Sequence, residues 1–240
     1  MCLILFAISP NDQDKLVVAA NRDEQHQRPT LAANYWKADQ NVLGGLDLQA
    51  GGTWLGLSRG GRFAAVTNYA ELPPDPLPPR SRGALTSNFL QSDVDPQQYL
   101  QEVDQDADQY RGFNLILSSG GTTWYYSNRS REMKALEPGF YGLSNQLLDC
   151  NWPKVISARQ DLISLSDSGF KTEGLFNLLA HKGDGTDHSA RFIIGEKYGT
   201  SVCTVVRLTS EKHYFEERSF DQAGQKKDRR VFEHERLLTK

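Results

Sequence analysis

Apolar residues along this chain fall into short runs that are separated by polar turn residues. The first two runs, 2–9 and 15–23, flank the segment Pro10-Asn11-Asp12-Gln13-Asp14, an arrangement typical of a β-hairpin. Both runs carry apolar side chains at odd and even positions alike. Strands of that kind are covered on both faces, so we expect this hairpin to lie in the interior of its sheet.

Further elements follow from the same pattern. A second hairpin is predicted at 53–58 and 62–69, and later strands at 113–119, 122–128, 191–195, 202–208 and 212–218. Helices are predicted at 83–92, 96–110, 152–165 and 172–181. The proline-rich segment 72–79 is expected to form a surface loop or flap. The charged tail from Gln225 is expected to be a solvated helix or partly disordered.

The order of these elements indicates the fold class. Strands, helices, strands, helices and strands succeed one another, without the strict βαβα alternation of a doubly wound sheet. Two antiparallel sheets sandwiched between helix layers would satisfy this order and would bury strands on both faces. We therefore predict an α+β protein, and the length of 240 residues suits a single domain over 1–240.

The composition narrows the function classes. Hydrophobic residues make up 38% and charged residues 24%, as in ordinary globular proteins, and the net charge of -3 gives no electrostatic reason to expect nucleic acid as a partner. No apolar run approaches the ~18 residues of a membrane-spanning helix, so no integral membrane segment is expected. The N-terminal segment MCLILFAISP lacks a basic region and is interpreted as a strand rather than a secretory signal.

Cysteine and histidine usage bears on location and on metals. Cys2, Cys150 and Cys203 form no C-x-x-C pair, which favours a reducing, cytoplasmic compartment and argues against disulfides and a cysteine-based zinc site. The five histidines lack metal-binding spacing, and the glycine pairs match neither a dinucleotide-binding nor a phosphate-binding loop. We therefore expect no metal and no cofactor.

Cys2 has a chemical option that depends on its position. A small second residue normally permits removal of Met1, which places an α-amine on the same residue as the thiol. An α-amine has a pKa near ~7.7–8.0 and can serve as the general base for its own side chain. The alternative interpretation is that Cys2 is a small buried residue at the start of a strand.

Polar residues at the end of the second run are the next candidates. Asn21-Arg22-Asp23-Glu24 follow an apolar strand, and a hairpin places them beside Cys2. Asp23 could hold the α-amine, and Arg22 could stabilise a thiolate or a product carboxylate. The alternative is a solvated turn with a local ion pair. Asn21 and Arg22 are therefore candidate binding residues beside Asp23.

Two asparagines elsewhere occupy a similar place. Asn68 and Asn145 each follow a short apolar strand, where an amide could donate to an oxyanion or could simply enter a turn. Tyr69, next to Asn68, and Trp54 are candidate binding residues, with Trp54 as a core or pocket-wall side chain.

Short motifs in a fixed order carry a family resemblance. They run from residue 1 to about residue 218 and cover most of the chain. Together they resemble the NRDE family, also called the transport-and-Golgi-organisation family. The motifs are Met1-Cys2, Asn21-Arg22-Asp23-Glu24, Gly52-Thr53-Trp54-Leu55-Gly56, Phe63-Ala64-Ala65-Val66-Thr67-Asn68, Arg82-Gly83, Gly112-Phe113-Asn114-Leu115, Tyr126-Ser127-Asn128-Arg129, Tyr141-Gly142-Leu143-Ser144-Asn145, Trp152-Pro153-Lys154-Val155 and Tyr198-Gly199-Thr200.

That family is similar in turn to N-terminal-nucleophile hydrolases of the choloylglycine hydrolase and penicillin V acylase type. The resemblance implies a four-layer αββα sandwich of two antiparallel sheets, with Cys2 as nucleophile and Asp23 in contact with its α-amine. It also implies that Asn68 and Asn145 lie near the oxyanion, and Arg191 resembles a late active-site arginine of the acylases.

Two positions depart from the expected pattern. The acylases carry an arginine three residues before the aspartate, and this chain has Ala20 there, while Arg22 falls on the other strand parity. The family commonly has an arginine after Tyr-Gly-Thr, and this chain has Ser201. The source of positive charge in the site is therefore open.

Two functions are consistent with this reading. The first is an amidohydrolase that acts on a linear, non-peptide amide C–N bond through a thioester on Cys2. The second is a non-catalytic binding or trafficking protein that carries haem or an acyl-lipid ligand on the same fold. Animal members of the family are linked to Golgi organisation, lipid metabolism and haem trafficking. In either case the expected partner is a small molecule.

Overall fold

The computed structural model of the chain describes residues 2–9, 11, 13–71 and 80–235. These residues divide into two compact units, each built on one antiparallel sheet. The first unit contains the segments 2–27, 138–144 and 148–235, and the second contains 28–137 and 145–147. In the part of the chain that the structure describes, no helix is long and apolar enough to cross a membrane.

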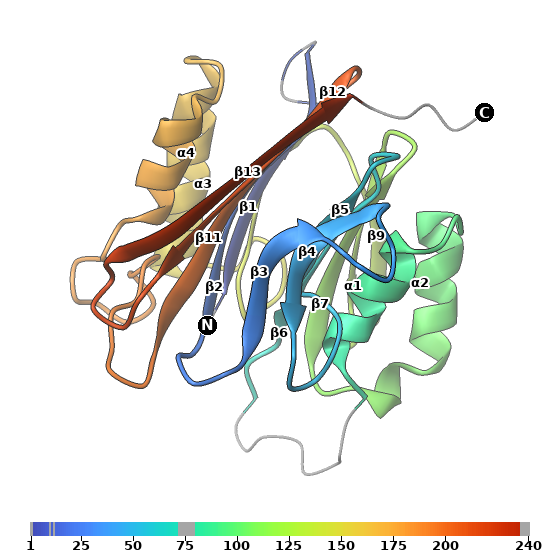
Figure 1. The fold of residues 1–240 in the computed structure, drawn as a ribbon, viewed down its shortest axis with the longest axis horizontal. Coiled ribbons are helices and arrows are strands. Elements are labelled where there is room, and N and C mark those ends of the chain that lie inside the picture. Colours follow the sequence, from blue (N-terminus) through green and yellow to red (C-terminus); the bar gives the residue numbers. More distant parts are fainter. Residues whose placement is uncertain (1, 10, 12, 72–79, 236–240) are drawn as a thin grey trace. The chain divides into compact units, whose positions relative to one another are not determined.

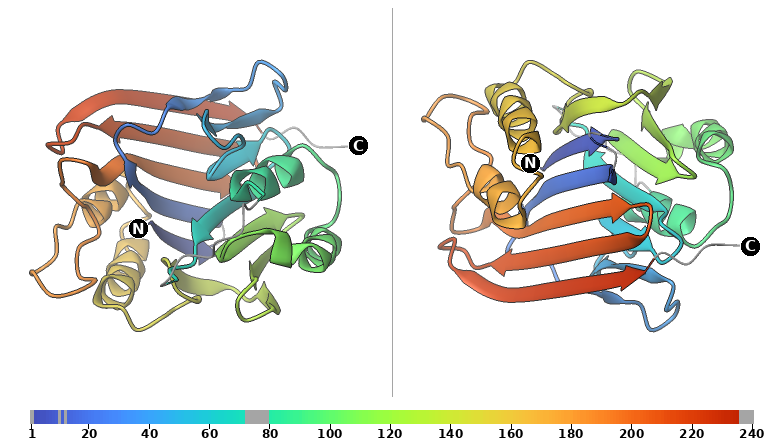
Figure 2. Two further views of the ribbon diagram at one scale, coloured as in Figure 1. Left: turned by 90° about the horizontal axis from the view of Figure 1, so that it is seen from below. Right: turned by 90° about the horizontal axis from the view of Figure 1, so that it is seen from above.

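The sheet of the first unit contains the N-terminal hairpin. Its strands, within the described residues, follow the order β10-β1-β2-β11-β12-β13, so β1 and β2 lie in the interior as predicted. In Figure 2 the two blue N-terminal strands run beside the orange and red C-terminal ones. The strands are β1 (Leu3–Ile8), β2 (Asp14–Gln25), β10 (Gly139–Leu143), β11 (Tyr198–Thr209), β12 (Lys212–Phe220) and β13 (Lys226–Glu235).

Two helices cover one face of this sheet, α3 (Pro153–Ser166) and α4 (Thr172–Leu179) (Figure 1). They pack on the odd-numbered side chains of β1, because alternate residues of a strand point to one face. Gly142 of β10 permits close approach of α3, since a Cβ there would lie 2.8 Å from Val155 Cγ1. The first turn of α3 is thereby fixed against β10 and β1.

The second unit has the strand order β3-β4-β5-β6-β7-β8-β9 in its described residues. Two helices and a short 3-10 turn pack on one face, through a core that includes Phe89, Leu100 and Phe113. Helix α2 begins as predicted, with Asp95 Oδ1 accepting from Gln97 N at 2.8 Å. The elements are β3 (Thr30–Tyr35), β4 (Val42–Asp47), β5 (Leu55–Ser58), β6 (Phe63–Asn68), α1 (Arg82–Leu90), α2 (Pro96–Gln105), η1 (Ala107–Gln109), β7 (Phe113–Ser119), β8 (Thr122–Ser127) and β9 (Glu132–Leu136).

Two predicted elements were wrong. Residues 191–195 form a loop rather than a strand, and the amides of Arg191 and Phe192 both donate to His181 O, at 2.9 and 3.0 Å. The charged tail forms strand β13 over 226–235 and pairs with β12. Charged residues suit this strand because it is the outermost of its sheet. The proline-rich segment 72–79 lies outside the described residues.

Candidate active site

Cys2 lies at the head of β1, immediately before Leu3, which pairs with Asn21 of β2. Its Sγ lies 4.0 Å from the main-chain carbonyl oxygen of Asp23, and its own carbonyl accepts a hydrogen bond from Ser144 Oγ at 2.6 Å. Burial raises the pKa of the Cys2 thiol above its usual value, and the Asp23 carboxylate adds to the rise. A thiol in this environment needs a base to become a nucleophile at neutral pH.

Asp23 is held by two residues of β11. Thr200 Oγ1 donates to Asp23 Oδ1 at 2.6 Å, and the Tyr198 hydroxyl donates to the Asp23 carbonyl at 3.0 Å. The carboxyl is buried, and desolvation raises its pKa although the Thr200 hydrogen bond and the Lys154 charge act in the opposite direction. Asp23 and Cys2 are therefore brought together at one end of the β1–β2 hairpin.

Asn21 and Arg22 point to opposite faces of β2, as their spacing requires. The Asn21 amide donates to Leu179 O at 3.0 Å and to Arg191 O at 2.7 Å, so it connects the strand to α4 and the following loop. Arg22 donates to Ser201 Oγ at 3.3 Å. Ser201 is the extra residue of a β-bulge between β11 and β2. The serine that replaces the family's arginine is thus in contact with Arg22.

Arg191 is buried beneath the two helices of the first unit. Its guanidinium donates to Leu178 O at 3.0 Å and to Ser157 Oγ at 3.0 Å, and it forms an ion pair with Asp161 at 2.7 Å. These contacts connect the 181–192 loop to α3 and α4. An active-site role for Arg191 stays a prediction.

Lys154 is a further candidate residue, which the sequence pattern placed in a motif but did not predict as a site residue. It is the second residue of α3, its side chain is 0% exposed, and its Nζ has no hydrogen-bond partner among the described residues. Nζ lies 5.5 Å from the centroid of the Trp152 ring. Burial lowers the pKa of Lys154, whereas the charges of Asp23 and Cys2 raise it. The available signal was a lysine in the first turn of a predicted helix, directly after Trp-Pro.

The predicted oxyanion residues belong to the second unit. Asn145 Nδ2 donates to Asn68 O at 2.8 Å, and Asn145 O accepts from Ala70 N at 2.8 Å. The structure therefore brings Asn68 and Asn145 together, with the Asn68 side chain exposed. Tyr69 follows at the end of β6 and donates its amide to Gly112 O at 2.8 Å.

Trp54 packs over the backbone of β4. A Cβ at Gly45 would lie 2.3 Å from Trp54 Cη2, so the ring fits against this strand because residue 45 has no side chain. The ring is half-buried, and the core or pocket-wall position and the binding role of Trp54 stay predictions.

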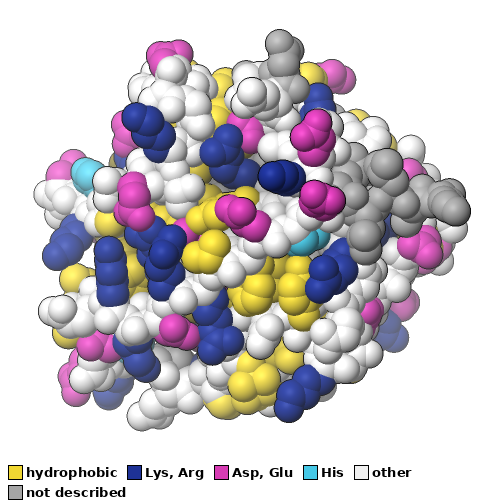
Figure 3. Space-filling model, turned by 45° about the horizontal axis from the view of Figure 1, so that its top comes forward, with side chains coloured by type: hydrophobic (Ala, Val, Ile, Leu, Met, Phe, Trp, Pro, Cys, Tyr) yellow, Lys and Arg dark blue, Asp and Glu magenta, His cyan; other side chains and the backbone are white. Residues whose placement is uncertain are grey.

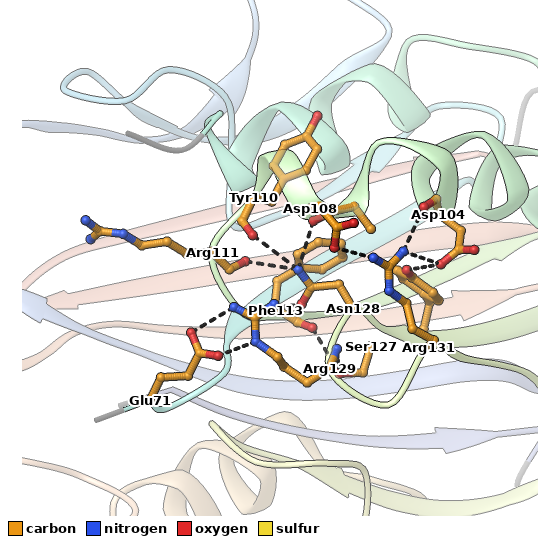
Figure 4. Close-up of polar contacts among 12 residues, drawn as sticks. Glu71, Asp104, Asp108, Tyr110, Arg111, Phe113, Ser127, Asn128, Arg129 and Arg131 are labelled. Carbon is orange, nitrogen blue, oxygen red and sulfur yellow. Dashed lines mark hydrogen bonds and ion pairs between the residues drawn. The ribbon is translucent and has the colours of Figure 1, made fainter. Parts of the chain in front are cut away.

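A second polar cluster in the same unit is built around Asn128 (Figure 4). Asn128 Oδ1 accepts from Phe113 N at 2.8 Å, while its Nδ2 donates to Ala107 O at 3.1 Å and Tyr110 O at 3.3 Å. Neighbouring Arg129 forms a bidentate pair with Glu71. This cluster satisfies the backbone of the turn between α2 and β7, which gives the Tyr-Ser-Asn-Arg motif a structural role.

Basic and acidic side chains are interspersed on the face seen in Figure 3. One concavity on the first unit, about 350 Å³ in volume, is lined by Glu173, Arg218, Lys226, Lys227, Asp228 and Arg229. Its arginines are already engaged: Arg218 pairs with Glu173 and Glu216, and Arg229 pairs with Glu216. This concavity therefore offers less net positive charge than its composition suggests.

Comparison with known proteins identifies the family. A sequence model of the Transport and Golgi organisation 2 family matches residues 1–222. The chain belongs to this family. Transport and Golgi organisation 2 homologues from Bos taurus and Homo sapiens are 42% and 41% identical, over 70% and 67% of this chain. The matches span 66% and 62% of those relatives, somewhat less than two thirds of their length. The Drosophila melanogaster family member is 27% identical over 90% of this chain and 92% of its own.

Solved structures identify the fold of this family member. An N-acylethanolamine-hydrolyzing acid amidase orthologue from Caenorhabditis elegans matches with a TM-score of 0.53 and 12% identity, over 85% of this chain and 92% of its own. The C2A mutant of a conjugated bile acid hydrolase from Clostridium perfringens matches with a TM-score of 0.54 and 9% identity, over 97% and 92%. The predicted fold class, the αββα class of N-terminal-nucleophile hydrolases, is confirmed.

Proposed function

We propose that this protein is an N-terminal-nucleophile cysteine hydrolase that cleaves a linear amide C–N bond after removal of Met1. The observation that carries the proposal is the position of Cys2, at the head of β1 with its thiol against the Asp23 carbonyl. The thiol has a raised pKa, so a nearby base is required, and the α-amine of residue 2 is a base within the same residue.

The reaction would proceed through an acyl-enzyme. The α-amine takes the thiol proton while Sγ attacks the amide carbonyl, and a C–S bond forms. As the C–N bond breaks, the α-ammonium returns that proton to the leaving amine. Water, deprotonated by the same α-amine, then attacks the thioester; a carboxylic acid leaves and the proton returns to Sγ. Asp23 would orient the α-amine and balance its charge.

The remaining predicted residues have roles that mutation can test. Asn68 and Asn145 would donate to the oxyanion, and Arg191 would contribute positive charge. Asn21, Arg22, Tyr69 and Trp54 would position the substrate. The names of the structural neighbours, an acid amidase and a conjugated bile acid hydrolase, support hydrolysis as the reaction class and an acylated small molecule as the substrate class.

The test begins with the intact mass of the purified protein, which should show loss of Met1. N-acyl derivatives of a fluorogenic aminocoumarin, with short and long acyl chains, should then be cleaved, and Cys2→Ala should lower turnover on the order of 10³-fold or more. Cys150→Ser is the matched control, because it removes a thiol outside the proposed mechanism. Retained Met1 would block the base and would contradict the proposal.

A second candidate is a binding or trafficking protein for haem or an acyl-lipid ligand in a reducing, cytoplasmic setting. Two observations favour it: the family is named for transport, and burial disfavours the reactive thiolate of Cys2. Titration with haem and with a fluorescent acyl lipid would test it. Tight binding that is unchanged in Cys2→Ala, without amide turnover, would support this candidate over the enzyme.

A further inference from the structure

Lys154 is placed where a lysine is unfavourable for stability in three separate ways. Its ammonium is withdrawn from water, since the side chain is 0% exposed. Among the described residues no acceptor lies within hydrogen-bond distance of Nζ. Lys154 is also the second residue of α3, where the partial positive charge of the helix N-terminus repels a cation.

The surroundings offset these costs only in part. The Trp152 ring lies 5.5 Å from Nζ, which is a favourable cation–π arrangement. Trp152 in turn stacks on His188 with ring centroids 4.1 Å apart, and Lys154 N donates to His188 O at 3.0 Å. The backbone and the aromatic platform hold Lys154 firmly in an unfavourable place. Buried charges of this kind cluster at functional sites.

The first turn of α3 brings Lys154 to the candidate site: Val155 lies against Gly142 of β10, and β10 pairs with β1, which begins one residue after Cys2. The neighbouring charges of Asp23, Cys2 and Cys150 raise the pKa of Lys154, against the effect of its burial. The interaction with Asp23 is reciprocal, because Lys154 is among the groups that lower the pKa of that carboxyl. No arginine stands at position 20, and Arg22 is engaged with Ser201 and Glu24. Arg22 nevertheless lowers the pKa values of Cys2 and Asp23, and Lys154 adds a second positive charge from α3.

We infer that Lys154 is a resident cation of the Cys2–Asp23 site, whose buried ammonium balances the negative charge of Asp23 and of the Cys2 thiolate. This is a positioning role that acts through Asp23 and Cys2. It rests on the proposed hydrolase function for its mechanistic meaning. An ionised Asp23 can hold the α-ammonium that forms when Cys2 loses its proton, so Lys154 stabilises the charge-separated state from which Sγ attacks.

The experiment measures the titration of Cys2 without requiring turnover. All proteins carry Cys150→Ser and have lost Met1 by intact mass, and Cys2 is alkylated with iodoacetamide between pH 6 and 10. Lys154→Met keeps the side-chain length and removes the charge. We expect the midpoint of alkylation to rise by about one pH unit and the rate at pH 7 to fall about tenfold. Lys154→Arg should restore most of the rate.

The control is Lys171→Met, the same substitution at an exposed lysine before α4, which should leave the profile unchanged. Other titratable groups near Cys2 are its own α-amine and, on β2, Arg22 and Asp23, whose carbonyl accepts from the Tyr198 hydroxyl; all of them are identical in every variant. A Lys154→Met profile that matches the wild type would overturn the inference.

A second measurement reads the charge of Lys154 in the protein that keeps this lysine, and uses a variant only to assign the signal. In protein labelled with ¹³C-lysine, the Lys154 Cε resonance, assigned by its loss in Lys154→Arg, should report an ammonium at pH 7. A neutral amine at that pH contradicts the inference. The outcome is separable from that of the proposed function. A shifted Cys2 titration without amide turnover would support the role of Lys154 and contradict the hydrolase function. Amide turnover with an unshifted titration would support the hydrolase function and contradict the role of Lys154.

Discussion

Thr200 connects the Asp23 carboxylate to the loop that follows Arg191. Its hydroxyl donates to Asp23 Oδ1 at 2.6 Å and accepts from Ile193 N at 2.8 Å. The residue is 1% exposed, so water cannot easily replace either hydrogen bond. A single hydroxyl therefore fixes the orientation of the Asp23 carboxylate and satisfies a loop amide. The position of Asp23 thus depends on Thr200, a residue far away in the sequence.

Replacing Thr200 by valine, which has nearly the same shape, should destabilise the protein by about 1–3 kcal/mol, because a loop N–H and a carboxylate oxygen each lose a partner. It should also raise the pKa of Asp23 further, since the Thr200 hydrogen bond lowers it. Urea unfolding measures the first effect, and the pH profile of Cys2 alkylation reports the second. Thr204→Val is the matched control, a buried threonine on the same strand. Equal losses of stability in Thr200→Val and Thr204→Val would contradict the role given to the Thr200 hydroxyl.

At the residue scale, the sequence could predict neighbours within a hairpin but not across the fold. Cys2 and Asp23 were found because antiparallel pairing fixes which residues of adjacent strands meet. Thr200 and Lys154 reach the same place from β11 and α3, and only tertiary packing brings them there. Strand parity correctly separated Asn21 from Arg22, but could not show that the Asn21 amide is used to hold Leu179 O and Arg191 O.

At the element scale, the turn between α2 and β7 depends on one asparagine. Asn128 supplies one acceptor and two donors to main-chain atoms of residues 107, 110 and 113, and it is 4% exposed. Arg131, close by, forms ion pairs with Asp104 and Asp108 at the surface. The two residues therefore differ in burial while belonging to the same cluster, which makes them a natural pair for comparison.

Asn128→Asp should be strongly destabilising, by about 3 kcal/mol or more, because a carboxylate would face carbonyl oxygens that now accept from an amide. Arg131→Ala should change stability by less than about 1 kcal/mol, since its ion pairs are solvent-exposed. Chemical denaturation of both variants provides the comparison. Similar losses for both would show that the cluster acts as a surface charge network rather than through the buried amide.

The elements that the sequence predicted well were those with an apolar face. The hairpin β1–β2 and helices α3 and α4 carry a regular apolar pattern, and their positions were found to within a few residues. Strand β13 was missed because its charged side chains suit the outermost position of a sheet, where composition resembles that of a solvated segment. The 191–195 segment was misassigned because Phe192 packs into the core from a loop.

On the scale of the whole molecule, carboxyl groups that are paired with arginine or tyrosine side chains determine how stability changes in acid. Hydrogen bonds from arginine and tyrosine side chains hold the pKa values of Glu71, Asp104 and Glu173 below their usual range. A carboxyl with a lowered pKa stabilises the folded state above its ordinary pKa, and this contribution is lost as the pH falls. Asp23 has a raised pKa and acts in the opposite sense, since it favours folding at low pH and loses that contribution as the pH rises.

Among the carboxyl groups of the first unit, Glu216 should contribute most to the loss of folding stability at low pH. Burial alone would raise its pKa, but hydrogen bonds from Arg229, Tyr214 and Arg218 outweigh it and lower the pKa from 4.5 to about 2. Two of these arginine contacts are 2.7 Å long, and the carboxylate is 0% exposed. At about 1.4 kcal/mol per pKa unit, Glu216 stabilises the fold by at most about 3–4 kcal/mol at neutral pH, and by less once screening of the exposed Arg229 is included.

Because the folded pKa is the lower one, this stabilisation is complete above pH 4.5 and disappears as the pH falls toward 2. Glu216→Gln should therefore lower Tm most at pH 7, and its difference from the wild type should shrink steadily between pH 5 and pH 2.5. Thermal unfolding across that range measures the difference directly. Glu211→Gln, at the exposed turn before β12, should show no such dependence. If the difference between Glu216→Gln and the wild type stayed constant with pH, the arginines would not be stabilising a buried carboxylate, and the charge network of β12 and β13 would have to be reassigned.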